Sequence, residues 1–506
     1  MAEQWYKNQE QKQLSIKCDE AFYNNDVTKL EKLAEECFSR GKKFESKNEN
    51  IMVSAKYFYN AGTCKSDILN ITKRNAEDED YEWILLCYRK AFKLADVYSR
   101  ISTKKVGWER STEKKQFYGF YYSLITNMSI LLNELGRKIS AVSIIYSTKN
   151  FSLGNAQQNL GLFLFEYGKL FIDSDNIAAN ILFKYAYLFL EAALKNDDGS
   201  MPNGIEEGTK KVLRYVDEFK DLKIQDNENI QMNDEVSYRL WACNNRLFLT
   251  PVNDVINSLV FAKDDIRIQS LVIPVEEDGT IELIGLFNEI KQEYVSARFT
   301  FYESISKKDM HFSDKDVDIW NVADYSIYNL RIQQMKMAFR SIYSIFDRIG
   351  FFIFKYLDIK MNERRVSFNS IWDKVSKDEL KNNDALNGLK WIHKDLNKKV
   401  DLKLDTNKES LDPELKDEAT IRNYIEHRYL KVVDFSNGGS NIEHSSNGIS
   451  YSVSKENFEK LTLYLMKKVR EAIILLTIMV KFEEENKGND DNLPIIEGIK
   501  IDDEFK

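Results

Sequence analysis

Apolar residues in the first 200 positions recur every three or four residues and are separated by short polar runs. This spacing places apolar side chains on one face of an α-helix. The predicted amphipathic helices cover residues 27–39, 49–68, 79–99, 112–136, 138–148, 155–172 and 177–195. Helices that follow one another through short connections indicate an α-solenoid.

One connection in this region has the character of a repeat turn. Asn133-Glu134-Leu135-Gly136-Arg137, followed by Ala141, resembles the turn of a tetratricopeptide repeat. Gly136 would let two helices meet closely, and the small Ala141 would let them pack. Glu166-Tyr167-Gly168 marks a weaker second copy. The period is irregular, so we expect a degenerate array, with a simple helical domain as the alternative.

The middle of the chain has a mixed pattern. Residues 270–274 and 280–284 are short apolar runs on either side of Glu276-Glu277-Asp278-Gly279. Two such runs around a polar turn predict a small β-hairpin. A helix over residues 286–306 is expected to follow.

The C-terminal third has the clearest helical pattern. From Tyr328 onward, apolar residues alternate at spacings of four and three, which is typical of a long helix in a bundle. Asp412-Pro413 is predicted to start another helix, with Asp as N-cap and Pro at the first helical position. Further predicted helices cover residues 367–375 and 384–396, and the last one begins after Ser454.

Length and composition turn these elements into a fold prediction. A chain of 506 residues is expected to hold two to four domains, and its 20 Gly and 5 Pro are too few for a turn-rich β protein. We predict a mainly all-α protein with four segments. These are a tetratricopeptide-like repeat domain at 1–200, a connecting segment with a hairpin at 201–320, a helical bundle at 321–485 and an acidic tail at 486–506.

Charge and cysteine usage narrow the classes of function. The net charge of −8 does not indicate general nucleic-acid binding, so any RNA site must be a local basic surface. No apolar run opens the chain, and 472–480 is too short to span a membrane, so we expect a cytoplasmic protein without membrane contact. The five cysteines form no CxxC pair and the four histidines no metal-binding pattern, so we expect reduced thiols, no metal and no cofactor.

One constellation has the chemistry for RNA cleavage. Arg422 and Asn423 precede His427 with three residues between Asn423 and His427. Attack by the RNA 2′-hydroxyl needs a base, an acid for the leaving 5′-oxygen, and positive charge at the phosphate. Histidine titrates near neutrality, and arginine holds two phosphate oxygens. Asn423 lies one helical turn before His427 and can orient the imidazole or the phosphate.

The spacing also limits the geometry. Five residues rotate a helix by about 140°, so Arg422 and His427 point in different directions. They converge only if the arginine wraps round the helix or if two copies of the motif face each other in a dimer. The structural alternative pairs Arg422 with Glu418 or Glu426 at one-turn spacing.

Arg-Asn-x-x-x-His on a late helix of an all-α bundle resembles the HEPN superfamily. The surrounding stretch 418–432 is similar to a bacterial branch that joins an N-terminal tetratricopeptide-like array to a C-terminal HEPN bundle, and so are residues 244–249, 290–298 and 338–347. The resemblance implies catalytic roles for Arg422, Asn423 and His427. It also implies metal-independent endoribonuclease activity that leaves 2′,3′-cyclic phosphate and 5′-hydroxyl ends.

Basic residues near the motif are the candidate RNA-binding groups. Residues 325–361 hold six basic against two acidic side chains in an otherwise acidic chain. We name Arg340 and Arg348 there, with Arg428 and Lys431 after the motif, as candidates for binding the RNA backbone. Upstream, Glu293 and Arg298 are expected to brace the middle segment against the bundle.

Three functions remain open at this point. The first is a toxin or anti-phage effector that cuts RNA as a homodimer or higher oligomer, with a protein trigger or antitoxin bound by the N-terminal array. The second is a non-catalytic RNA-binding or scaffold protein. The third is an RNA- or nucleotide-binding module that works beside a nucleotidyltransferase.

Overall fold

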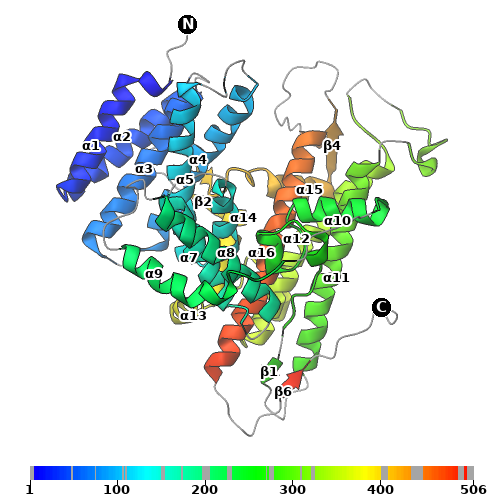
Figure 1. The fold of residues 1–506 in the computed structure, drawn as a ribbon. Helices are drawn as coiled ribbons and strands as arrows, with labels where there is room; N and C mark the ends of the chain where they lie inside the picture. Colours follow the sequence, from blue (N-terminus) through cyan, green and yellow to red (C-terminus); the bar gives the residue numbers. More distant parts are fainter. Residues whose placement is uncertain are drawn as a thin grey trace. The chain divides into compact units, whose positions relative to one another are not determined.

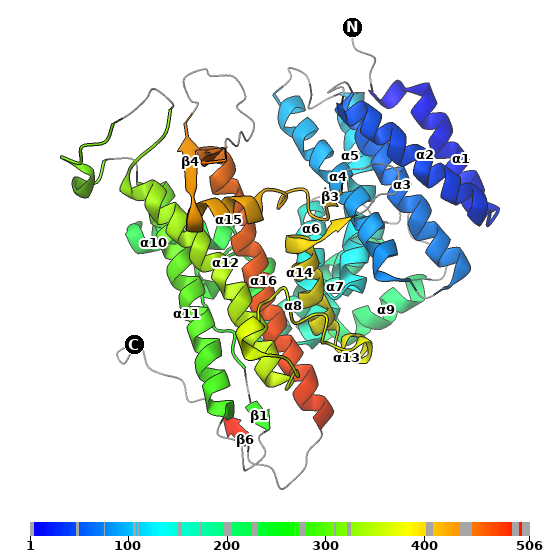
Figure 2. The same ribbon diagram turned by 180° about the vertical axis from the view of Figure 1, so that it is seen from behind.

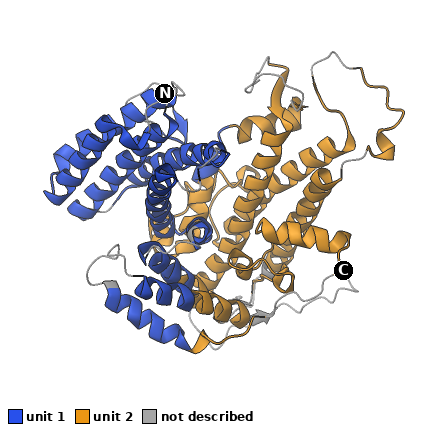
Figure 3. Cartoon of the chain, turned by 45° about the horizontal axis from the view of Figure 1, so that its top comes forward, with its two compact units in different colours: residues 1–165, 186–217, 394–416 blue, residues 166–185, 218–393, 417–506 orange. Residues whose placement is uncertain are grey.

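The computed structural model divides the chain into two compact units, which are described separately (Figure 3). The N-terminal unit comprises residues 1–165, 186–217 and 394–416, and the C-terminal unit comprises 166–185, 218–393 and 417–506. The structure describes residues 5–46, 50–74, 76–104, 108, 111–149, 154–172, 175–196, 205–224, 231–268, 270–272, 279–307, 310–320, 325–400, 408–434, 448–487 and 495–497.

Helices make up the described part of the N-terminal unit, apart from one small strand pair (Figure 1). They are α1 (Gln9–Tyr23), α2 (Val27–Ser46), α3 (Ile51–Thr72), α4 (Asp78–Ser102), α5 (Thr112–Glu134), α6 (Lys138–Ile145) and α9 (Ile205–Val216), with α7 (Gly154–Lys169) and α8 (Asn176–Lys195) shared between the units. All seven predicted helices are present. The pattern missed α1 because its buried stripe is thin: Gln11, Leu14, Cys18 and Ala21.

The turn between α5 and α6 forms as its glycine predicted. Gly136 has a positive φ of 76°, which side chains with a Cβ rarely adopt. The Gly136 N–H donates to the Asn133 carbonyl at 3.1 Å, and the Arg137 N–H donates to the Leu132 carbonyl at 2.8 Å. This pair of hydrogen bonds forms a Schellman motif at the end of the helix. It gives partners to two carbonyls that α5 would otherwise leave without a hydrogen bond. Ala141 is fully buried in the next helix.

A segment far away in the sequence completes the N-terminal unit. Asp395, fully buried, accepts hydrogen bonds from Arg89 at 2.6 Å and from Arg137 at 2.7 Å. Strands β2 (Lys399–Val400) and β3 (Glu409–Ser410) follow and pair antiparallel (Figure 2). Because a buried carboxylate is stable only when its charge is matched, Asp395 fixes this segment to α4, which carries Arg89, and to the turn between α5 and α6, which carries Arg137.

Three thiols that lie far apart in the sequence meet in the same unit. Cys18 on α1 is in side-chain contact with Cys37 on α2 and Cys64 on α3. All five cysteines are buried and free, as expected from their irregular spacing. Cys18, Cys37 and Cys64 act as small apolar groups where α1, α2 and α3 pack.

The C-terminal unit is a helical bundle with a few short strands. Its helices are α10 (Asp234–Asn244), α11 (Gly279–Ser306), α12 (Leu330–Tyr356), α13 (Lys377–Asn382), α14 (Asp384–Asn397, whose last residues belong to the N-terminal unit), α15 (Glu418–His427) and α16 (Lys455–Lys487). α12 packs against α11, α15 and α16, and Phe339, Ile342, Phe346 and Ile349 of its predicted stripe are buried. The mainly all-α class is confirmed.

Three local predictions were wrong. The hairpin predicted over residues 270–284 does not form. Its first strand, β1 (Ser270–Val272), pairs antiparallel with β6 (Ile495–Glu497), which lies in the predicted tail. Its second predicted strand, 280–284, is part of α11, which begins at Gly279. A short apolar run fits a strand and a helix equally well, and only the distant partner decides. Residues 367–375 form turns rather than a helix.

The third error concerns the helix predicted to start at Asp412-Pro413. The Asp412 carboxylate instead accepts the Glu414 N–H at 3.1 Å in a local turn, and α15 begins at Glu418. α15 ends at His427, because Tyr429–Val433 does not continue the helix. It forms strand β4, which pairs in parallel with β5 (Ser450–Ser454). Val432 and Val433 favour the extended backbone, and both are buried in it.

Among the described residues, only α8 is long and apolar enough to pass a test for a membrane span. Of its most apolar 18-residue window, 44% is buried inside the protein.

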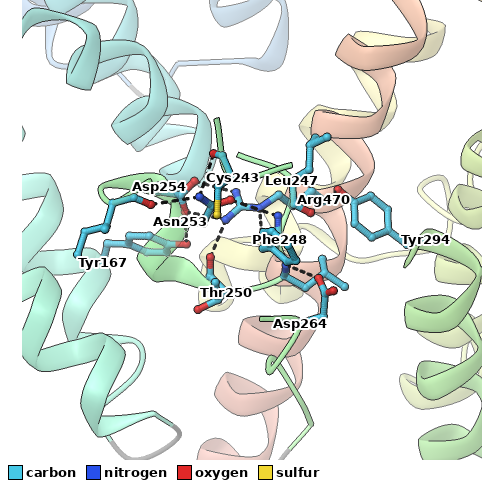
Figure 4. A network of polar contacts seen from close by, with 12 residues as sticks. Tyr167, Cys243, Leu247, Phe248, Thr250, Asn253, Asp254, Asp264, Tyr294 and Arg470 are labelled. Carbon is cyan, nitrogen blue, oxygen red and sulfur yellow. Dashed lines mark hydrogen bonds and ion pairs between the residues drawn. The ribbon is translucent and has the colours of Figure 1, made fainter. Parts of the chain in front are cut away.

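Two buried arginines hold one loop of the C-terminal unit, and the first, Arg470, is labelled in Figure 4. Arg470 on α16 donates to both oxygens of Asp254, at 2.7 and 3.2 Å, and to the carbonyls of Phe248 and Thr250. The Tyr167 hydroxyl donates to the same Asp254 carboxylate at 3.0 Å.

The second arginine is Arg298 on α11. It donates to Asp264 at 2.7 and 2.8 Å and to the Leu247 carbonyl at 2.8 Å. We expected Arg298 to brace the middle segment against the bundle, but Asp264 and Leu247 also lie within residues 201–320, so these bonds hold the middle segment together. Glu293, on the same helix, does join the middle segment to the bundle, because it pairs with Arg348 on α12 at 2.8 Å.

We expect Arg470→Met to lower the free energy of unfolding of the C-terminal unit by about 3–5 kcal/mol, because Asp254 would remain buried without its counter-charge. Chemical denaturation of the full chain measures the effect. The matched control is Lys360→Met, which breaks an ion pair with Asp358 at an exposed position. Equal stability of the two variants would contradict a structural role for the ion pair between Arg470 and Asp254.

Candidate functional site

Helix α15 carries the whole Arg-Asn-x-x-x-His motif and divides it between two faces. Ile421 and Tyr424 are buried and fix the helix to the bundle, with the Tyr424 ring 5.6 Å from that of Tyr451 on β5. Asn423 and His427, one turn apart, lie on the exposed face. The helix ends at His427, because the following residues turn into β4.

Arg422 packs inward from this helix. Its guanidinium lies 4.1 Å from the ring centroid of Tyr343 on α12, and its Nε lies 3.4 Å from the Glu426 carboxylate. The cation–π contact and the ion pair both hold the long side chain against the bundle. Glu426, which the sequence offered as an alternative partner, therefore does pair with Arg422. The Arg422 side chain remains 36% exposed.

His427 lies at the rim, with 70% of its side chain exposed. Its Nε2 is 3.6 Å from the second oxygen of Glu426, whose first oxygen faces Arg422. Glu426 thus links the two motif residues that helix geometry separates. Sequence reasoning treated it only as a competing ion-pair partner, although its position between the two was visible.

Glu418 is a site residue that the sequence analysis named only as an alternative ion-pair partner of Arg422. It lies one turn before Arg422 and is fully buried, and neither carboxyl oxygen has a hydrogen-bond partner among the described residues. Burial raises the pKa of the Glu418 carboxyl to about 8, while the nearby positive charge of Arg422 acts in the opposite direction. The carboxyl is therefore neutral at pH 7. Its sequence signal was a carboxylate on the buried stripe that also contains Ile421.

The candidate RNA-binding cations have mixed environments. Arg428 donates to the Gly448 carbonyl at 3.3 Å, and Lys431 lies on β4. Arg340 is exposed on α12. Arg348 is paired with Glu293 and, at 3.5 Å, with Glu289.

Other cations of α12 and its C-terminal end are matched as well. Lys355 pairs with Glu363 and Lys360 with Asp358, while the Lys336 ammonium donates to the Leu430 carbonyl. The positive excess seen in the sequence is therefore smaller on the folded surface. Among the described residues, no group of three or more His, Cys, Asp or Glu side chains is arranged to hold a metal ion.

Comparison with known families agrees with this architecture. Residues 274–483 match the family model described as LA2681-like HEPN. The C-terminal part of the chain is therefore a HEPN superfamily domain, and this domain contains α12, α15, α16 and the complete motif. Searches of curated proteins and of solved structures returned no significant match.

We expect Glu418→Gln to change how stability depends on pH. The pKa of Glu418 is about 8 in the folded chain and near 4.5 when it is exposed, so unfolding releases a proton between these values. Wild-type stability should fall through this window by at most about 1.4 kcal/mol per pH unit, and glutamine should remove this fall.

Thermal unfolding from pH 5 to pH 9 measures the difference between the variant and the wild type. Glu456→Gln, at an exposed position in the first turn of α16, is the control. A difference that does not grow with pH would show that Glu418 is ionised in the folded state.

Proposed function

We propose that this protein is a metal-independent endoribonuclease whose site is built from Arg422, Asn423 and His427. One observation carries the proposal: a HEPN domain presents an exposed histidine and a partly exposed arginine on one helix, linked by Glu426. HEPN domains are associated with RNase-like or nucleotide-related activity, which agrees with this chemistry.

In the proposed reaction, a neutral His427 accepts the proton of a ribose 2′-hydroxyl, and the 2′-oxygen attacks the adjacent phosphorus. The bond from phosphorus to the 5′-oxygen breaks, and this oxygen leaves with a proton from an acid. The products are a 2′,3′-cyclic phosphate and a 5′-hydroxyl. Arg422 stabilises the charge of the pentavalent phosphate, and Asn423 positions the phosphate or the imidazole.

The acid in this scheme is the His427 of a second copy of the chain. Arg422 packs toward Tyr343 while His427 faces solvent, so one motif does not surround a phosphate by itself. Two motifs facing each other across a two-fold axis would supply a base, an acid and two arginines. We therefore propose a homodimer as the active form.

We further propose that the N-terminal array controls the nuclease as part of a toxin or anti-phage effector. The support is segment 394–416, which lies within the HEPN match but belongs to the N-terminal unit. Its Asp395 is bound by Arg89 and Arg137, and the chain then enters α15 at Glu418. A trigger or antitoxin that moves the array would act directly on the start of the motif helix.

The alternative is a non-catalytic RNA-binding or scaffold protein. It is favoured by the contacts of Arg422 with Tyr343 and Glu426, which would also suit a purely structural arginine. The two functions differ in whether the motif side chains are needed for RNA cleavage.

Replacing the motif side chains separates these functions. We expect His427→Ala and Arg422→Ala each to lower the rate of RNA cleavage in EDTA by about 10²–10⁴-fold, since each removes a group that acts in the transition state. Lys360→Ala, an exposed cation outside the motif, is the control and should cleave at the wild-type rate. Cleavage that persists in both motif variants would refute the assignment.

Control by the array has its own test. Glu409 lies 2.6 Å from Lys90 and 2.8 Å from Lys42, so Glu409→Lys places three positive charges together and loosens the segment that leads into α15. We expect the rate of RNA cleavage to rise on the order of fivefold. Glu414→Lys, at a more exposed ion pair in the same segment, should change it less. An unchanged rate in Glu409→Lys would exclude control through this segment.

A further inference from the structure

Glu418, at the start of the motif helix α15, is a buried titratable group that the proposed reaction does not use. Its side chain is fully buried, and neither carboxyl oxygen has a hydrogen-bond partner among the described residues. Buried polar groups are nearly always hydrogen-bonded, and an exception calls for an explanation. A carboxylate in such a place would be unstable, so the packing itself requires Glu418 to keep its proton.

Arg422 lies one turn after Glu418, at the spacing where a glutamate and an arginine on a helix can pair. In the described part of the chain these two side chains are not paired. The Arg422 guanidinium lies 4.1 Å from the ring centroid of Tyr343, and its Nε lies 3.4 Å from the carboxylate of Glu426, one turn further along. Arg422 therefore has an acidic residue one turn away on each side, and it contacts only Glu426.

Ionisation of Glu418 would change this balance. Burial raises the pKa of the Glu418 carboxyl to about 8, while the charge of Arg422 acts in the opposite direction. Once ionised, the buried carboxylate needs a counter-charge, and Arg422 is the cation whose charge already acts on it. The long arginine side chain can turn toward Glu418, because a cation–π contact is weaker than the attraction between two buried charges.

Other ionisable groups around Glu418 come from the elements that pack against α15. Tyr343 and Asp347 lie on α12, Tyr451 lies on β5, and Asp417 precedes the helix, while β4 joins α15 at its opposite end. Burial raises the pKa of both tyrosines, so they stay neutral while Glu418 titrates. The Asp347 carboxylate accepts a backbone N–H at 3.0 Å. Above neutral pH, Glu418 is thus the group on the buried side of α15 that gains a charge.

We propose that Glu418 is a positioning residue that switches Arg422 between two states. While Glu418 holds its proton, the guanidinium stays over Tyr343 and is free to bind a phosphate of the RNA. When Glu418 loses the proton to solvent, its carboxylate pairs with the guanidinium and draws it away from the phosphate. RNA binding is then strong at neutral pH and weakens as the pH rises through the titration of Glu418. The inference rests on the proposed function and deepens it, because it states how the same site is regulated.

Binding of a fluorescent 2′-O-methyl oligoribonucleotide to the full chain at pH 7 and pH 9 tests the switch, because this probe cannot be cleaved. The probe contains only adenosine and cytidine, whose bases lose no proton between these values. We expect the wild-type Kd to rise about tenfold, since a new negative charge opposes the phosphate. Glu418→Gln cannot ionise, so it should bind like the wild type at pH 7 and about tenfold more tightly than the wild type at pH 9. Comparison at the same pH cancels the titration of other groups.

Arg422→Ala shows whether Glu418 acts through the arginine. This variant should bind the probe more weakly at both pH values, and adding Glu418→Gln to it should no longer tighten binding at pH 9. A glutamate that merely supports the fold would have the same effect on binding at both pH values. Glu456→Gln, at an exposed position in the first turn of α16, is the matched control and should keep the wild-type rise in Kd.

A wild-type Kd that is equal at pH 7 and pH 9 would overturn the switch without the use of any variant. An equal rise in Glu418→Gln, or absence of binding at pH 7, would overturn it as well. The nuclease is judged separately, by cleavage of RNA in EDTA. If the wild type shows the rise in Kd but cleaves no RNA, the switch stands and the nuclease assignment fails. If it cleaves RNA while Kd does not change with pH, the switch alone fails.

Discussion

The C-terminal unit depends on the ion pair between Arg470 and Asp254. Both side chains are almost fully buried, and the arginine also donates to two carbonyls of the loop that carries Asp254. Charges buried in this way are stable only with their partners present, so the loop and α16 can pack in only one register. Arg298 fixes the adjoining part of the same loop to α11 through Asp264. Since α12 packs against both α11 and α16, and α15 packs against α12, the ion pair between Arg470 and Asp254 determines where the motif lies.

The motif itself combines rigidity with exposure. Tyr343 and Glu426 hold Arg422, whereas His427 stands at the rim, where α15 gives way to β4. At pH 7 the buried Glu418 is neutral and does not balance the positive charge of Arg422. Glu426 is therefore the main anionic contact of Arg422. A phosphate would compete with the partly buried carboxylate of Glu426 but not with that of Glu418. This arrangement is consistent with an arginine that is positioned before substrate binds.

The sequence predicted the fold well where periodicity was long. The α12 stripe and the helices of the N-terminal array extend over many turns, and a period of 3.6 residues is then unambiguous. The short elements were not predictable in this way. β1 forms because it meets residues 495–497, and residues 429–433 leave the helix because β5 lies beside them. Such partners lie outside any local window of sequence.

The same limit applied to the site. Arg422, Asn423 and His427 were visible as a motif, and the structure places all three on α15. The neutral state of Glu418 was not visible, because it depends on burial that only packing creates. The matched charges of Arg348, Lys355 and Lys360 were also hidden, since their acidic partners lie on other turns and segments.

The central proposal is that the motif residues on α15 cleave RNA by using its ribose 2′-hydroxyl as the nucleophile. The most direct measurement compares an RNA with the same RNA carrying a single 2′-deoxyribose at the cleaved position, using the full chain in EDTA and reading the ends of the products. The account predicts 2′,3′-cyclic phosphate and 5′-hydroxyl ends from the RNA and no cut at the deoxyribose. Equal cleavage of both substrates, or 5′-phosphate ends, would contradict it.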